Sequence, residues 1–323
     1  MIFSKKIKEI YKQNVMIRKD PDGLTFYYSG TDFPGLCSTP IAFKNSFGDL
    51  LSGYIYYYPN PIDGHLVIFD HGMGCGHRAY MREIEKLCSH GYKVFSYDHT
   101  GCAESSGDGI KGFAGSLADL DFAIRAVRSS DEFSGAKLTV MGHSWGAFST
   151  MNSVALHSDI SSIVALSGFA SVKIIQNEKI GGFLSLWRKD LYELEKQINP
   201  EYYYYSAIDS LLSTRTPALI IHSEDDPIVS FKNNFERLRS VLIGKSNVSF
   251  CALKGKKHNP QYSDRAVEKL GEFYAALSSI RKSKKKLDES EKAKFVSSFD
   301  WNVMTEQDDA VWAMIFDHID SNR

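Results

Sequence analysis

A serine set between two glycines is the residue of this chain best placed to do chemistry. Ser144 is the centre of the run GHSWG at 142–146, which fits the pattern G-x-S-x-G. The run follows an apolar stretch at 138–141 and opens a helical pattern, so Ser144 is expected at a sharp turn between a strand and a helix. Glycines two positions to either side avoid collisions with the neighbouring backbone. This context predicts a nucleophilic serine that attacks a carbonyl carbon.

The elements that must hold this serine alternate between buried strands and helices. Continuous apolar runs, typical of parallel strands covered on both faces, occupy 66–69, 94–97, 138–141, 163–166, 218–221 and 248–253. Helical patterns occupy 77–90, 116–129, 146–157, 231–243 and 261–281. A β-hairpin is expected before them, at 40–58. The order predicts an α/β fold with one mostly parallel central sheet and helices on both of its faces.

Two of the helix starts carry residues that often cap helices. Ser116 and Asp119 fit a capping box at the start of the helix at 116–129. Thr305 is expected to cap a last helix, which has apolar residues at helical spacing between 311 and 319. Because such a face is not stable in water, the last helix must dock on another part of the chain.

The nucleophile turn within this alternation of elements resembles that of the α/β-hydrolase family, over roughly residues 40–280. With GHS at the turn and a compact cap, the chain is similar to the monoacylglycerol-lipase-like and serine-aminopeptidase-like members. In this family an acid and a histidine follow the serine in the chain, each after a later strand. The carboxyl ends of parallel strands share one edge of the sheet, so the three residues can meet there.

The resemblance implies an acid and a base at two later strand ends. The segment SEDDPIV at 223–229 is similar to the family's G-x-x-D-x-x-V, with serine where glycine is usual. Asp226 is then the acid, and its neighbour Asp225 is the residue to exclude. His258, which follows the last apolar run, is the implied base. His258 would remove the proton of Ser144 while Asp226 fixes the imidazole tautomer, and water would release the resulting acyl-enzyme.

Two backbone amides are implied as the oxyanion hole. The segment DHGMGCG at 70–76 resembles the family's H-G-x-x loop, in which Met73 would supply one amide. Trp145, the residue after the nucleophile, would supply the other. The segment DHTGCAESSG at 98–107 is similar to another loop of the family, with Ala103 where glycine is usual. In most members that segment is structural, so the departure does not affect the expected chemistry.

The ends of the chain and one internal segment break the rhythm of strands and helices. Residues 1–19 contain six basic side chains and one acidic one, and are expected to form an amphipathic helix. We expect it to pack on its own protein, with peripheral contact to a membrane surface as the alternative. The hydrolase domain is expected over 20–281, with a cap inserted at about 172–213. Residues 282–323 are expected to form a charged linker and the C-terminal helix.

The composition excludes several classes of protein. The 38 basic and 39 acidic residues leave a net charge of −1, which argues against a nucleic-acid partner. No apolar run approaches the roughly 18 residues that a transmembrane helix needs. The five cysteines are an odd number without paired spacing, as expected of free thiols in a reducing compartment. With lysines spread through its first residues where a secretory signal would be apolar, the protein is expected to be cytoplasmic.

Histidines and carboxylates near the expected edge of the sheet raise the question of a metal site. The residues concerned are Asp70, His71, His77, Asp98 and His99. Neither HxHxDH nor HExxH spacing occurs among them. His71 is moreover part of the implied oxyanion loop. We therefore expect neither a metal nor another cofactor.

The cap contains two kinds of side chain that could select a substrate. The four tyrosines at 202–205 could line an acyl pocket, or could fasten the cap to the domain. A peptidase would need an acidic group to bind a free amine, and Glu178, Glu193, Glu195 and Glu201 are available. An ester hydrolase needs no such anchor.

These features predict a serine hydrolase that acts on a small-molecule acyl substrate. A carboxylesterase or small lipase is the simplest form of this prediction. A serine aminopeptidase acting on short peptides is the closest alternative, because the chemistry is the same and only the pocket differs. An acyltransferase would exclude water during deacylation. A non-catalytic binding module on the same fold is disfavoured by the intact set of Ser144, Asp226 and His258.

Overall fold

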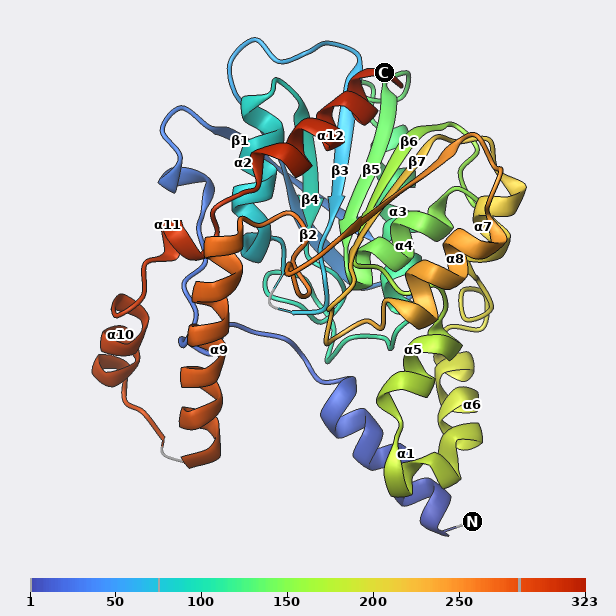
Figure 1. Cartoon of the computed structure of the whole chain (residues 1–323), viewed down its shortest axis with the longest axis vertical. Helices are drawn as coiled ribbons and strands as arrows, with labels where there is room; N and C mark the ends of the chain where they lie inside the picture. The colour runs from blue at the N-terminus through green and yellow to red at the C-terminus, as the bar shows by residue number, and fades with distance from the viewer. Residues whose placement is uncertain (1, 75, 284–285) are drawn as a thin grey trace.

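An eight-stranded sheet runs through the centre of the molecule (Figure 1). The computed structural model describes residues 2–74, 76–283 and 286–323. The strands are β1 (Cys37–Lys44), β2 (Leu50–Tyr57), β3 (His65–Asp70), β4 (Lys93–Tyr97), β5 (Lys137–His143), β6 (Ile160–Leu166), β7 (Ala218–Ser223) and β8 (Val248–Leu253). Their order in the sheet is β1-β2-β4-β3-β5-β6-β7-β8.

The sheet is mostly parallel, as the continuous apolar runs predict. The β1–β2 and β2–β4 pairs are antiparallel, and the pairs from β4 through β3, β5, β6 and β7 to β8 are all parallel. Each of the six runs expected as a strand lies within one of the strands β3 to β8. The predicted fold class is therefore confirmed. The hairpin lies at the antiparallel end of the sheet, away from the strands that carry the predicted site.

Helices cover both faces of this sheet. They are α1 (Ile2–Val15), α2 (Met81–Ser89), α3 (Gly115–Arg128), α4 (Trp145–Ser153), α5 (Val172–Lys179), α6 (Arg188–Ile198), α7 (Ala207–Ser213), α8 (Arg237–Val241), α9 (Asp264–Ser283), α10 (Glu289–Ser297), α11 (Trp301–Met304) and α12 (Asp309–Asp320). Shorter helical turns span Gly30–Asp32, His77–Tyr80, Gly182–Trp187 and Lys232–Glu236. The single helix expected at 231–243 is thus a π-helical turn followed by α8.

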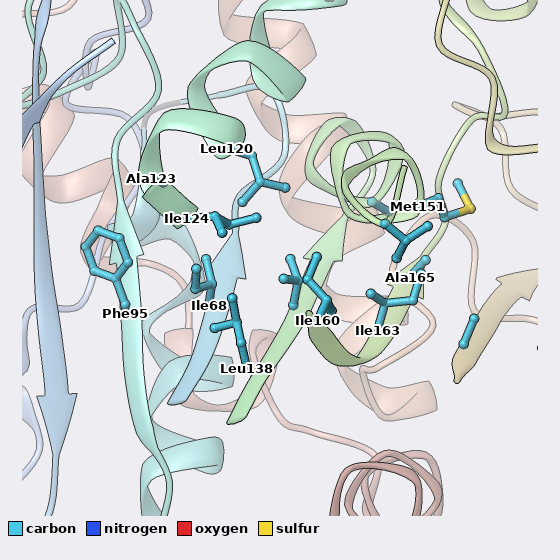
Figure 2. Packing of buried hydrophobic residues seen from close by; sticks show 14 of the residues in the cluster. Ile68, Phe95, Leu120, Ala123, Ile124, Leu138, Met151, Ile160, Ile163 and Ala165 are labelled. Carbon is cyan, nitrogen blue, oxygen red and sulfur yellow. The ribbon is translucent and has the colours of Figure 1, made fainter. Parts of the chain in front are cut away.

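One apolar core lies between the sheet and the helices α3, α4 and α8. Figure 2 shows Ile68 of β3 and Leu138 of β5 near Ile124 of α3, and Met151 of α4 near Ala165 of β6. The strand residues of this core occupy alternate positions along each strand, so their side chains share one face of the sheet. The core fixes α4, and with it the turn that contains Ser144.

The C-terminal helix α12 lies on the opposite face of the sheet, beside α2 (Figure 1). Trp312 and Ile315 are buried against strand residues such as Val164 and Ile221. The apolar face of the last helix therefore docks on the sheet. The cap of this helix was wrongly expected at Thr305, which ends α11. Asp308 caps it instead, accepting hydrogen bonds from two amides of its first turn at 3.0 and 3.1 Å.

The start of α3 also differs from the expected capping box. Ser116 lies inside the helix, whose N-cap is Ala114, and its Oγ donates to the carbonyl of Trp145 at 3.3 Å. The Asp119 carboxylate faces the core, where it accepts hydrogen bonds from the amide and hydroxyl of Thr100, both at 2.8 Å. These two polar side chains therefore connect α3 to neighbouring segments.

The segment inserted between β6 and β7 consists of α5, a 3-10 turn, α6 and α7. Helix α1 packs on this segment, below the sheet in the view of Figure 1. Ile7 and Tyr11 of α1 are buried, and the Tyr11 hydroxyl donates to Glu195 of α6 at 2.8 Å. The N-terminal amphipathic helix thus packs on its own protein.

Part of the charged stretch after α9, which was expected to be a linker, is helical. Helix α10 begins at Glu289, and Asp288 and Glu291 form a reciprocal capping box at its start. Phe295 at the end of α10 then packs against Phe273 of α9, with ring centroids 6.0 Å apart. Local capping and this aromatic contact order a segment whose charges had indicated solvated coil.

Candidate active site

Ser144 lies at the turn between β5 and α4. Its φ of 56° and ψ of −109° are a backbone conformation that residues with side chains rarely adopt. Its N–H donates to the carbonyl of Leu166 in β6 at 2.8 Å, which holds the turn. A Cβ on Gly142 would lie 2.5 Å from the Gly146 carbonyl oxygen, and one on Gly146 would lie 2.0 Å from that of Asp70. A side chain at position 142 or 146 would therefore clash with the neighbouring backbone.

The structure brings the three predicted side chains together at the carboxyl edge of the sheet. The Ser144 hydroxyl donates to His258 Nε2 at 2.9 Å, and His258 Nδ1–H donates to Asp226 Oδ2 at 2.7 Å. The Asp226 side chain is fully buried, the His258 side chain is 17% exposed, and Ser144 is partly exposed. The hydrogen bonds therefore lead from a buried carboxylate to an accessible hydroxyl.

The environment of Asp226 favours the ionised carboxylate. Its Oδ1 accepts hydrogen bonds from the amides of Ile228 and Val229 at 2.8 and 3.0 Å, and His222 Nε2 lies 3.1 Å from Oδ2. Burial alone would raise the pKa of Asp226, but the hydrogen bonds from His222 and His258 outweigh it and hold the pKa well below its usual range. His222 is a partner that sequence reasoning did not assign.

The neighbouring Asp225 performs a different task. Its Oδ1 accepts hydrogen bonds from the Ser223 hydroxyl and from the amides of Gly255 and Lys257, at 2.5, 3.1 and 3.3 Å. Its Oδ2 pairs with the Lys257 ammonium at 2.9 Å. Burial opposes these contacts, yet they lower the pKa of Asp225 to about 2. Asp225 therefore holds the loop that presents His258.

The Trp145 amide is the first N–H of α4. Amides in the first turn of a helix have no partner within the helix, so they can donate to a negatively charged oxygen. The side chain of Trp145 is buried, and its indole N–H donates to the carbonyl of Phe113 at 2.7 Å. This contact fixes the first residue of α4 next to Ser144.

Met73 lies in the loop after β3, and His71 fixes the peptide that carries its amide. His71 Nδ1–H donates to the Gly72 carbonyl at 2.7 Å, and Nε2 accepts from the His99 amide at 3.0 Å. Burial lowers the pKa of His71 to about 3, so the ring is neutral with its proton on Nδ1. In a trans peptide C=O and N–H point in opposite directions, so fixing the Gly72 oxygen also orients the Met73 N–H.

A second histidine, His143, connects the loop after β3, which contains Met73, to the loop of His258. Its Nε2–H donates to the His258 carbonyl at 2.7 Å, and its Nδ1 accepts from the Tyr80 hydroxyl at 2.8 Å. Tyr80 in turn accepts from the Gly72 amide at 3.2 Å. Burial lowers the pKa of His143 to about 3, so it stays neutral. Sequence reasoning assigned no role to His143 or Tyr80.

The histidines and carboxylates considered for a metal site bind one another. His77 donates from its amide and from Nδ1 to Asp98 Oδ1, both at 2.7 Å. His99 lies between two carboxylates, 3.0 Å from Asp70 and 3.3 Å from Asp119. Within residues 2–74, 76–283 and 286–323, no group of three such side chains has an arrangement suited to a metal ion. Cys75, in the same loop, lies outside the described residues.

Some of the cap side chains considered for substrate selection have partners elsewhere, whereas Glu193 and Glu201 are exposed. The Tyr202 hydroxyl donates to Asp121 of α3 at 2.7 Å, so Tyr202 fastens the cap to the domain, while Tyr204 is 64% exposed. Glu178 accepts hydrogen bonds from the Ser230 amide and the Asn234 side chain, and Glu195 accepts from Tyr11 and from the amide of Phe113.

The sheet order and the turn at Ser144 define a protein of the α/β-hydrolase class. A family profile described as "Serine aminopeptidase, S33" matches residues 62–244, more than half of the chain. The chain therefore belongs to this family of α/β hydrolases.

Solved structures show the same fold at low sequence identity. The Pyrococcus furiosus esterase Pf2001 is 18% identical, with a TM-score of 0.59 over 82% of this chain and 98% of its own. The acetyl xylan esterase from Paenibacillus sp. R4 is 15% identical, with a TM-score of 0.57 over 85% of this chain and 93% of its own. The α/β hydrolase GrgF from Penicillium sp. sh18 is 14% identical, with a TM-score of 0.53 over 81% and 99%. No curated protein matches the sequence.

Proposed function

We propose that the protein is a serine hydrolase that cleaves an ester or related acyl bond, most simply a carboxylesterase or small lipase. The observation that carries this proposal is the hydrogen-bonded line from Asp226 through His258 to Ser144. A serine hydroxyl that donates to an imidazole, which in turn donates to a carboxylate, is the arrangement that acyl transfer by a nucleophile, a base and an orienting acid requires, and this supports the proposal. The esterases among the structures of similar fold support the same chemistry.

Acylation follows from this geometry. The Ser144 oxygen attacks the substrate carbonyl carbon as His258 Nε2 takes the hydroxyl proton. The carbonyl π electrons move to oxygen, and the amides of Met73 and Trp145 stabilise the resulting oxyanion. As the tetrahedral intermediate collapses, the bond to the leaving alcohol breaks and His258 gives that oxygen the proton. The ionised Asp226 stabilises the imidazolium throughout.

Deacylation repeats these steps with water as the nucleophile. His258 takes a proton from water, the hydroxide attacks the acyl carbon, and the oxyanion forms again between the same two amides. Collapse breaks the bond to Ser144, and His258 returns the proton to the serine oxygen. The products are a carboxylic acid and an alcohol.

The family description makes a serine aminopeptidase the second candidate. Such an enzyme needs a free acidic group near the site to bind the amine of its substrate. Glu178 accepts hydrogen bonds from Ser230 and Asn234, and Glu195 accepts one from the amide of Phe113, so both connect the cap to the rest of the chain. Burial also raises the pKa of Glu195 to about 7, so at neutral pH it is partly uncharged. Glu193 and Glu201 are exposed and remain available to bind an amine.

Replacing the nucleophile tests the proposal. We expect Ser144→Ala to lower the hydrolysis of p-nitrophenyl acetate and butyrate by at least about 10⁴-fold. The matched control is Ser240→Ala, at an exposed serine of α8, which should retain normal turnover. A chain-length series of esters, measured beside aminoacyl-naphthylamides, compares the two candidates. Wild-type turnover by Ser144→Ala would reject the proposal.

We propose that residues 20–281 form the catalytic domain, with 172–213 as its cap, and that 1–19 and 282–323 are helical additions packed on it. We propose a cytoplasmic location, which the free thiols of Cys37, Cys88 and Cys251 support. Within the described part of the chain, no helix is both long and apolar enough to cross a membrane.

A further inference from the structure

A cavity of about 330 Å³ lies beside the oxyanion loop, outside the cap. Its walls come from Gly72, Met73 and Gly74 of the loop, from the start of α2 and the turn before it, and from α9, α11 and residues 25–28. Asn259, the residue after His258, also lines it. The cavity therefore borders both the amide proposed to bind the oxyanion and the loop of the proposed base.

The charged side chains that line this cavity are all arginines: Arg78, Arg82 and Arg281. Arg281 pairs with Asp22 at 3.0 Å. In the part of the chain that the structure describes, no carboxylate oxygen lies within 4 Å of the guanidinium group of Arg78 or Arg82. The wall of the cavity thus carries two positive charges without a paired acid.

The hydrogen bonds of these two arginines leave donors available. Arg78 donates to the carbonyls of Tyr28 and Tyr27 at 3.2 and 3.4 Å. The guanidinium of Arg82 lies 5.9 Å from the centre of the Tyr28 ring, and its buried Nε has no hydrogen-bond partner. A buried donor without a partner costs free energy, which a bound anion would recover.

The carboxylate next to Arg82 in the sequence, Glu83, forms no ion pair with it. Glu83 is fully buried, and its Oε1 accepts from Gln261 at 3.0 Å. Burial raises the pKa of Glu83, which favours its neutral form. Neither Arg78 nor Arg82 therefore forms a direct ion pair in the described part of the chain, so both guanidinium groups can pair with a bound anion.

We propose that this cavity is a subsite for an anionic group, a carboxylate or a phosphate, carried by the ester that Ser144 cleaves. The inference rests on the proposed function and names its substrate class. A substrate carbonyl oxygen bound at the Met73 amide has its carbon next to the loop that lines the cavity. A substituent on the alcohol or on the acyl side can then extend over Gly74 towards Arg82.

The remaining walls fit a flat apolar spacer between the ester and the anion. Tyr28, Phe273 and Trp301 line the cavity, and the rings of Phe273 and Trp301 lie 5.2 Å apart at 71°. Aromatic walls contribute apolar contact, while the arginines supply charge-assisted hydrogen bonds. A substrate with an aromatic ring and an acidic group uses both.

Matched esters test the subsite. For an anion on the alcohol side of the ester, hydrolysis of 4-acetoxybenzoate and of 4-acetoxyphenyl phosphate is compared with that of the neutral 4-acetoxybenzamide. For an anion on the acyl side, hydrolysis of monophenyl adipate is compared with that of the neutral phenyl hexanoate. We expect an anionic ester of one of these pairs to have a kcat/KM about tenfold above its neutral partner, mainly through a lower KM. The pair that shows the preference identifies the side that carries the anion. Equal rates in all three comparisons would overturn the proposal.

Charge variants connect this preference to the cavity. Arg82→Gln should lower the ratio of anionic to neutral kcat/KM about tenfold, and Arg82→Lys should retain most of it. The matched control is Arg239→Gln, because Arg239 also lies over an aromatic ring, 5.7 Å from the centre of Phe235, but does not line the cavity. If Arg82→Gln leaves the ratio unchanged, or if Arg239→Gln lowers it equally, the assignment is wrong.

A binding measurement separates failure of the subsite from failure of the proposed function. The Ser144→Ala variant is titrated calorimetrically with three anions: 4-hydroxybenzoate, 4-hydroxyphenyl phosphate and monomethyl adipate. We expect the variant to bind at least one of them with a dissociation constant about tenfold below that for the neutral 4-hydroxybenzamide. Anion binding without turnover by the wild type would reject the hydrolase and retain the subsite. Ester turnover by the wild type without tighter anion binding would retain the hydrolase and reject the subsite.

Discussion

Two adjacent aspartates show how strongly the role of a residue depends on the direction of its side chain. Asp226 faces His258 at 2.7 Å, whereas Asp225 binds the amides of the loop that presents this histidine. Both carboxylates are held ionised, so charge alone does not separate them. Geometry assigns Asp226 to the imidazole and Asp225 to the loop.

Exchanging each aspartate for asparagine should separate these roles. Asp226→Asn keeps the shape but loses the charge that stabilises the imidazolium, so we expect kcat for p-nitrophenyl butyrate to fall about 10³- to 10⁴-fold. Asp225→Asn should lower kcat about tenfold or less, because it only loosens the loop. Steady-state kinetics of both purified variants measure this difference. A larger loss in Asp225→Asn would exchange the two assignments.

The sequence was sufficient to place Ser144, Asp226 and His258 near one another, because each follows a strand that continuous apolar residues make recognisable. The parts that remained unassigned are contacts between segments. Tyr80 and His143 meet at 2.8 Å although they are 63 positions apart in the chain. His222 approaches Asp226 only because a short turn folds back on β7. Such pairs leave no periodicity in the sequence that could reveal them.

At the scale of elements, the C-terminal region does two things for the fold. Helix α12 covers one face of the sheet, and its N-cap, Asp308, accepts a hydrogen bond from the Lys256 ammonium at 2.7 Å. Lys256 lies two residues before His258 and is also bound to the carbonyl of Tyr262 at 2.9 Å. The region therefore supports both the sheet and the loop of the proposed base.

Removing the largest side chain of α12 should show how much its docking contributes. Trp312 is buried against β6 and β7, and its indole N–H donates to Gln307 at 2.7 Å. We expect Trp312→Ala to lower the free energy of unfolding by about 3–5 kcal/mol, measured by urea titration. The control is Asp317→Asn on the exposed face of α12, expected to change it by less than about 0.5 kcal/mol. Similar losses in both variants would contradict the docking.

The helix boundaries that sequence patterns missed have a common cause. Thr305 and Asp308 are both good caps, and only the packing of α12 on the sheet decides between them. Asp119 has the spacing of a capping box, but its carboxylate has better partners in Thr100 and Asn45. Tertiary contacts thus overrode local signals. The six apolar runs placed strands β3 to β8 correctly, but β8 lies at the edge of the sheet and is only partly buried, not covered on both faces as expected.

At the scale of the whole molecule, a buried group of charges connects the sheet, α3 and the oxyanion loop. His99 lies between Asp70 and Asp119, Tyr97 donates to Asp70 at 2.8 Å, and the His71 ring lies 4.4 Å from that of His99. Burial alone would lower the pKa of His99, but the two carboxylates outweigh it and raise the pKa to about 10. His99 is therefore a buried imidazolium at neutral pH.

The other buried groups leave a range of pH in which His99 can be observed. Burial lowers the pKa of His65, His71, His143 and His318, so these residues are neutral in the folded protein and lose their protons near pH 6.5 when it is unfolded. The raised pKa of Glu195, about 7, affects stability between its unfolded value of 4.5 and pH 7. Burial also raises the pKa of Asp70, Glu83 and Cys88, so the contribution of His99 is identified by comparison with a variant that lacks this imidazole.

The stability of the protein should therefore fall as the pH rises above neutrality. His99 binds its proton more tightly when folded, so its contribution is complete below its unfolded pKa of 6.5 and is lost as the pH rises to about 10. Between pH 7.5 and pH 9 the free energy of unfolding should decrease by about 2 kcal/mol, measured by urea titration at each pH. His99→Gln has no proton to lose at this position, so its stability should be lower but should decline much less over the same interval. A wild-type stability that is constant or rising over this interval, or an equal decline in His99→Gln, would show that His99 is not held as an imidazolium by Asp70 and Asp119.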